Sequence, residues 1–141
     1  MRRFGMLGLA LAALVAGGMS APASPSAERE PGSTIDMPYL IAPVVVDGAL
    51  FANAYVTSQI VATSAAATIV VRDKLPFIQD AFVRDVNAEP IGKPADPATV
   101  DVPALTARLL ADAQRIVGPG FIDTIHIVRV QMSLLHPKAP S

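Results

Sequence analysis

The chain has 141 residues, of which 11 are Lys or Arg and 12 are Asp or Glu, so its formal charge at neutral pH is −1. This near-neutral balance lacks the excess of positive charge with which proteins bind nucleic acid or an anionic membrane surface. The chain contains no cysteine, which excludes disulfides, thiol-based catalysis and cysteine-ligated metals.

The N-terminal segment has the three parts of a secretory signal peptide. Two arginines near the start supply positive charge, the run Met6–Ala16 is apolar, and small residues occupy positions 21 and 23, which signal peptidase reads. We therefore expect residues 1–23 to be a signal peptide that is cleaved after Ala23. Because no charged residue lies between Arg3 and Glu28, an uncleaved membrane anchor is the alternative.

The composition, rich in Ala with 13 Pro and no Trp, is typical of bacterial proteins encoded by GC-rich genes. A bacterial secretory signal predicts that the protein is located in the periplasm. If the N-terminal segment is not cleaved, the protein is instead anchored in the inner membrane and faces the periplasm.

The rest of the chain is long enough for one folded domain. Residues 24–36 are mostly polar and contain prolines and a glycine without an apolar period, so we expect a disordered tether there. The folded domain is expected to span residues 37–135. Residues 136–141 are expected to be a flexible polar tail.

A β-hairpin is predicted at the start of this domain. Tyr39–Val46 is rich in β-branched residues, and the dipeptide Asp47-Gly48 that follows readily supplies the two positive φ angles of a tight turn. Pro43 has no N–H to donate, so its strand is expected at a sheet edge or with a bulge at that point. The partner strand is Ala49–Ala62.

Side chains alternate between two kinds along this second strand, as expected when one face meets a core. The apolar set, expected to face the core, is Leu50, Ala52, Ala54, Val56 and Ile60. The opposite set is Phe51, Asn53, Tyr55, Thr57 and Gln59. We take Phe51, Tyr55, Thr57 and Gln59 as candidate residues of a partner-binding face, since two of them are aromatic side chains on the less apolar side.

Residues 65–87 are predicted to form one long helix. Apolar residues recur every three to four positions, and Asp80 and Arg84 form an i,i+4 pair on the opposite side. Pro76 lies inside this segment and should bend the helix. The alternative is a strand up to Val71 followed by a helix that begins at Pro76.

The remaining segments are a loop, a helix and a strand. Ala88–Val100 contains three prolines and a glycine, which predicts a loop. Asp101 is a suitable N-cap for a second helix, whose expected core stripe is Val102, Leu105, Leu109, Ala113 and Ile116, and Gly118 should end it. Phe121–Met132 is predicted to be the last strand. The order strand, strand, helix, helix, strand predicts an α+β fold, a three-stranded antiparallel sheet with two helices on one face.

The sequence offers no catalytic constellation. His126 and His136 are the only histidines, and the acidic residues are scattered singly, without the converging pairs of glycosidases or the oxygen-rich loops that bind calcium. We therefore identify no catalytic, cofactor-binding or metal-binding residue and expect a non-enzymatic protein that uses no cofactor and binds protein partners.

The order of the elements and the amino-acid pattern of the central segments resemble the FliL family. These are bacterial flagellar basal-body-associated proteins whose periplasmic domain is similar to the stomatin-type module. The resemblance is carried by residues 50–63, by Thr68–Asn87 with its Leu75-Pro76 step, by Val100–Gly118 and by the final strand. It implies a structural accessory protein that sits beside the stator units of the flagellar motor, supports motility and can form homo-oligomers.

The chain departs from this family in one respect. Family members are usually held by an uncleaved membrane helix, whereas the start of this chain has the pattern of a cleavable signal. The alternative function is therefore an adaptor or binding module of the envelope that is unrelated to motility. Such a module could bind an extended segment of another protein along the edge strand Tyr39–Val46.

Overall fold

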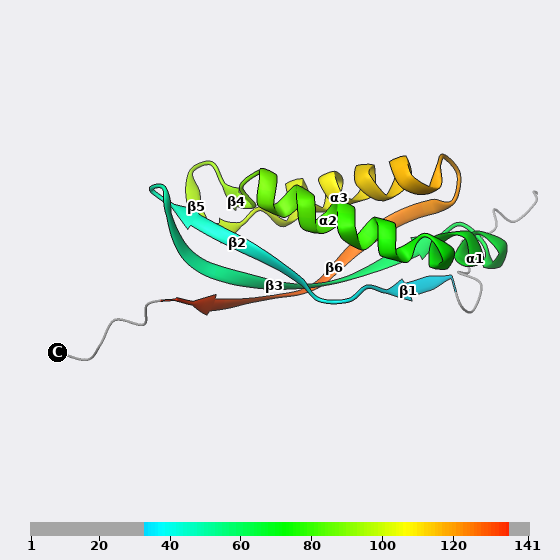
Figure 1. Ribbon diagram of the computed structural model, residues 1–141, viewed down its shortest axis with the longest axis horizontal. Helices are drawn as coiled ribbons and strands as arrows, with labels where there is room; N and C mark the ends of the chain where they lie inside the picture. The colour runs from blue at the N-terminus through cyan, green and yellow to red at the C-terminus, as the bar shows by residue number, and fades with distance from the viewer. Residues whose placement is uncertain (1–32, 136–141) are drawn as a thin grey trace, which may run out of the picture.

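The computed structural model describes residues 33–135. The predicted signal peptide, residues 24–32 of the predicted tether and the tail 136–141 lie outside the described residues. The fold is α+β and has two layers, an antiparallel sheet and a layer of helices on one of its faces (Figure 1). Within residues 33–135, no helix is both long and apolar enough to cross a membrane.

The sheet is built around β3 (Ala49–Ala62). Along one edge β3 pairs first with β2 (Leu40–Val46) and then with β1 (Thr34–Asp36), and along the other edge it pairs with β6 (Ile122–Leu134), always antiparallel. The sheet is thus three strands wide but contains four strands. β1 corrects the predicted tether, because its Ile35 is buried in the core while its backbone pairs with β3.

The predicted hairpin between β2 and β3 is confirmed. Asp47 and Gly48 have φ angles of 51° and 78°, and Val46 pairs with Ala49 across this two-residue turn. β2 pairs with no other strand of the described chain, and its register shifts after Val44, so Pro43 lies in an edge strand next to a bulge. Both features accommodate a residue that cannot donate a backbone hydrogen bond.

The predicted single bent helix is two helices. α1 (Ala65–Asp73) begins at Ser64, whose hydroxyl accepts from the Ala67 N–H at 3.0 Å, and α2 (Leu75–Ala88) follows after Lys74. Pro76 lies in the first turn of α2, where a missing N–H costs nothing. The prediction of a continuous helix was wrong because the proline is tolerated better at a new helix start than inside a bend. The alternative strand up to Val71 was also wrong.

The segment predicted as a loop contains a small hairpin, in which β4 (Gly92–Lys93) pairs with β5 (Asp96–Val100). α3 (Val102–Val117) follows as predicted. The Asp101 carboxylate accepts from the Ala104 N–H at 3.2 Å, and Gly118, with φ 90°, ends the helix. These two residues supply the local start and stop signals of α3.

The core lies between the helix layer and the sheet. α2 contributes Ile78, Phe82 and Val86, and α3 contributes Leu105, Leu109 and Ala113, all of them buried. The predicted stripe of α3 is wrong at both ends, since Val102 is exposed and Ile116 only half-buried, while Asp112 and Val117 are buried instead. The centre of the stripe, Leu105, Leu109 and Ala113, is buried as predicted, and at its C-terminal end an aspartate of this helix lies against α2.

Candidate functional site

The face of the sheet that carries no helix is the first candidate site. We call it the helix-free face and define it by the side chains that the strand alternation and pairing place there: Ile41, Phe51, Asn53, Tyr55, Thr57, Gln59, His126, Arg129 and Gln131. In β3, Ala52, Ala54 and Val56 are fully buried, whereas Phe51 is 41% and Tyr55 38% exposed. The predicted alternation is thus confirmed from Ala52 onward. Leu50 departs from it, since it is exposed near the turn rather than packed in the core.

Tyr55 lies at the centre of this face. Across the strands its partners are Ile41 of β2 and Gln131 of β6, and Ile41 is half exposed. Tyr39 immediately precedes β2 and is 71% exposed. Together with Tyr55 and Gln131 it lines a shallow depression of about 330 Å³. The sequence analysis did not include Tyr39 and Ile41, although the alternation of β2 would have identified Ile41.

Polar side chains flank the centre on the side toward the end of β3. Thr57 lies opposite Arg129, and Gln59 lies opposite His126. The Gln59 side-chain amide donates to Asp36 at 2.7 Å, which connects β3 to β1. The candidate residues Phe51, Tyr55, Thr57 and Gln59 therefore share one face, with an aromatic and aliphatic half toward the β2–β3 turn and a hydrogen-bonding half away from it.

The turn end of the sheet adds further exposed apolar side chains. A second depression, of about 240 Å³, is lined there by Val46, Ala49, Leu50, Phe51 and Leu134. The Leu135 N–H donates to the Phe51 carbonyl at 3.3 Å, which holds the end of β6 beside Phe51. The apolar half of the helix-free face thus continues around the end of the hairpin.

Both edge strands of the sheet keep one side without a strand partner in the described chain. β2, the edge expected to capture a peptide, is interrupted by Pro43 and by the bulge after Val44. β6 pairs only with β3, and it is longer and contains no proline. The edge with more free backbone donors is therefore β6, since proline removes one donor from β2.

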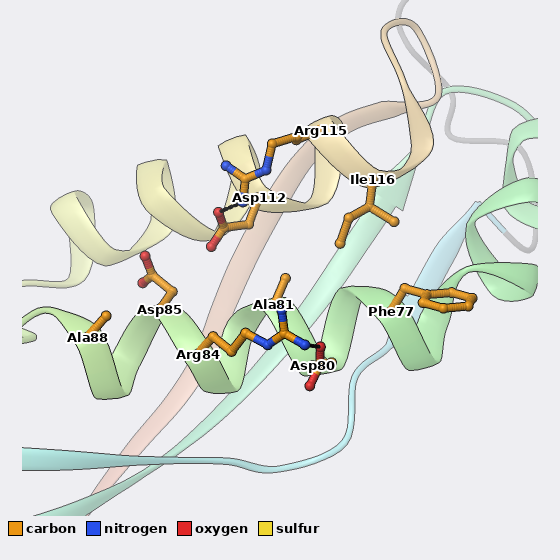
Figure 2. A pocket seen from close by; sticks show the side chains of 9 residues that line it. All are labelled: Phe77, Asp80, Ala81, Arg84, Asp85, Ala88, Asp112, Arg115 and Ile116. Carbon is orange, nitrogen blue, oxygen red and sulfur yellow. Dashed lines mark hydrogen bonds and ion pairs between the residues drawn. The ribbon is translucent and has the colours of Figure 1, made fainter.

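The second candidate site is a groove between the two long helices, which we call the α2–α3 groove (Figure 2). Its volume is about 530 Å³. The lining residues are Phe77, Asp80, Ala81, Arg84, Asp85 and Ala88 of α2 and Asp112, Arg115 and Ile116 of α3. It thus combines apolar walls with three carboxylates and two guanidinium groups.

Ion pairs organise the charges of this groove. Arg84 contacts Asp80 at 2.6 Å on the exposed side of α2, and Arg115 contacts Asp112 on α3. Asp85 is paired with Arg108 at 2.7 Å, and both side chains are about four-fifths buried. The second carboxylate oxygen of Asp112, Oδ2, is buried and accepts no hydrogen bond from a described residue.

In residues 33–135, no group of three or more His, Asp or Glu side chains is placed to hold a metal ion. His126 is exposed on β6, and the residue paired with it across the sheet is Gln59. Neither site brings a nucleophile together with a general base, which is the arrangement that covalent catalysis requires.

No protein-family model matches this chain, and no curated protein matches it. The geometry of the two sites is therefore the basis of the functional proposal.

Proposed function

We propose that this chain is a non-enzymatic accessory protein of the bacterial envelope that binds another protein through the helix-free face. The observation that carries the proposal is the row Ile41–Tyr55–Gln131, with Phe51 further along the same face, beyond Asn53. Three of these four side chains are large and apolar, and they are exposed where a covering layer would bury them. Contiguous exposed apolar surface of this kind marks interaction sites on soluble domains.

The composition of the helix-free face supports a protein as the occupant. Tyrosine and phenylalanine are enriched at the centres of protein interfaces, because they bury a large area at a small cost in side-chain entropy. The charged side chains at this face are Arg129 and Asp36, and Asp36 already accepts from Gln59, so a polar margin lies beside an apolar centre. A flat face with this pattern suits another folded protein better than a small molecule, which needs a concave site.

The resemblance to the FliL family supports a more specific partner. The partner would then be a component of the flagellar stator, and the site of action would be the periplasm after export by the N-terminal signal. In that setting the protein would support motility by contact, and copies of the chain could assemble with one another.

An envelope adaptor unrelated to motility is the second candidate. It is favoured by the free edge of β6, along which an extended peptide could add a strand to the sheet. The two candidates differ in the partner and in the surface that contacts it.

Site-specific photo-crosslinking in cells tests the proposal. A photoreactive phenylalanine analogue is placed at Tyr55 in one strain and at Gln114, an exposed position of α3, in a matched control strain. We expect a stator or motor protein to be cross-linked from position 55 and not from position 114, and deletion of the gene to reduce swimming or swarming. Equal cross-linking from both positions would contradict the role of the helix-free face. Normal motility together with cross-links only to other envelope proteins would favour the adaptor.

A further inference from the structure

We propose that the α2–α3 groove is a second binding site, which receives a lysine or arginine side chain of a partner protein with Asp112 as the acceptor of its cationic group. Asp112 is 7% exposed, although aspartate on a helix usually faces solvent. One of its oxygens accepts from Arg115, and the other, Oδ2, accepts from no described residue. The site lies on the helix layer and is separate from the helix-free face.

A buried carboxylate oxygen without a donor is unfavourable, because the carboxylate has lost water and gained no compensating hydrogen bond. A carboxylate can accept about four hydrogen bonds, so Asp112 retains the capacity for an additional donor. Figure 2 shows one of its oxygens directed away from Arg115, toward the space between the two helices.

The two arginines at the rim of the groove can leave their aspartate partners when another cation binds. The side chains of Arg84 and Arg115 are 79% and 69% exposed, and ion pairs of such exposed groups contribute little to stability. Oδ2 is buried and the Arg115 guanidinium is paired with Oδ1 beside it, so the Arg115 side chain must move aside before an incoming cation can take its place at the carboxylate. Displacement exchanges an exposed pair for one that a partner covers from water, which strengthens the electrostatic attraction.

The rest of the groove fits a cation that is carried on an apolar stem. Ala81, Ala88 and Ile116 supply apolar wall beside the carboxylates, and Phe77 is 60% exposed. The Phe77 ring already has the ammonium group of Lys74 at 5.5 Å from its centre, so it lies in a position where a cation can approach its face. A bare metal ion would use neither the apolar wall nor the ring. A lysine or arginine side chain uses both the carboxylate and the apolar wall, because its methylene groups pack while its charged end is paired.

The test is a titration of the isotope-labelled protein, followed by NMR, with a short blocked peptide that contains one central lysine between glycines. The control peptide carries norleucine in place of lysine. We expect the lysine peptide to shift amide signals of α2 and α3, and the norleucine peptide to leave them in place. Asp112→Asn keeps the shape of the side chain and should raise the Kd of the lysine peptide by at least about tenfold, since a charged hydrogen bond is lost.

Two further variants control this result. Phe77→Ala changes an exposed residue and should also weaken the peptide, while Asp123→Asn, an exposed aspartate of β6, should leave its Kd unchanged. Unchanged affinity in both Asp112→Asn and Phe77→Ala, or equal shifts with the norleucine peptide, would overturn the proposal. Tighter binding of free 1,5-diaminopentane than of the lysine peptide would also overturn it, because the ligand would then be a small amine. All these readouts concern the helix layer, so they are independent of the cross-links expected from Tyr55.

Discussion

Arg108 should be among the most important charged residues for stability, because it joins α3 to the C-terminal end of α2. Its guanidinium donates to the Asp85 carboxylate at 3.0 Å, to the carbonyl of Pro90 at 2.8 Å, and to the carbonyls of Asp85 and Glu89 at 3.2 Å each. The carbonyls of Glu89 and Pro90 follow the end of α2, and the Asp85 carbonyl also accepts from the Glu89 N–H, so Arg108 fixes the chain where it leaves the helix and its positive charge complements the helix dipole.

Arg108→Met removes all of these donors while it keeps much of the apolar stem. Each buried acceptor left without a donor costs about 1–3 kcal/mol, but the site is partly open to water, which replaces some of the lost bonds. The side chains of Arg108 and Asp85 are 22% and 18% exposed, so the pair is closer to a buried than to a surface ion pair. We expect the free energy of unfolding to fall by about 2–4 kcal/mol, which is a large part of the ~5–15 kcal/mol of a typical domain.

Thermal and urea denaturation followed by circular dichroism measure this loss, and a midpoint lower by roughly 10–25 °C is expected for a domain of this size. Arg84→Met is the matched control, since Arg84 also pairs with an aspartate of α2 but at the exposed surface, and should cost less than about 1 kcal/mol. Arg108→Lys should lie between the two because lysine lacks the forked donor geometry. If Arg108→Met is no less stable than Arg84→Met, the hydrogen bonds of Arg108 to the end of α2 do not contribute the expected stability.

Three other substitutions have definite expected outcomes. Phe82→Ala should reduce the free energy of unfolding by about 3–5 kcal/mol because Phe82 is fully buried between the helices and the sheet; an unchanged urea midpoint would show that this packing is wrong. Gly92→Ala should destabilise the protein by about 1–3 kcal/mol, since its Cβ would lie 2.2 Å from the Pro97 carbonyl oxygen, and hydrogen exchange should then increase first in β4 and β5. Tyr55→Asp should abolish the cross-linking partner's binding and change the urea midpoint little, whereas a large loss of stability would place Tyr55 in the core.

The parts of the fold that could be predicted are those with strong local signals. Asp47 and Gly48 predict a turn because few other residues tolerate their φ angles, and Asp101 and Gly118 mark the ends of α3 through their own backbone and side-chain preferences. β1 could not be predicted in the same way. It consists of only three residues, and what makes them a strand is the edge of β3 more than twenty residues away.

The candidate sites likewise divide into one that local sequence signals predict and one that only the tertiary packing determines. The outward row of β3 followed from a period of two, because residues that alternate along one strand share a face in any sheet. The α2–α3 groove did not follow from the sequence, since the burial of Asp112 depends on how closely α2 packs beside α3. That packing is set by the core between the helices and the sheet, to which Leu105, Leu109 and Val117 belong, and is a property of the whole fold.

The two ends of the described chain lie at opposite ends of the long sheet, with β1 at the α1 end and the end of β6 beside the β2–β3 turn (Figure 1). A pull applied between these ends acts along the strands, and the backbone hydrogen bonds between β3 and β6 run across them, from the pair Ala52–Leu134 to the pair Ala62–Ile122. Tension would therefore shear these bonds together instead of opening them one after another. At the N-terminal end the same pull acts first on the three pairs of β1 with β3, so β1 is the part of the sheet that tension should detach first.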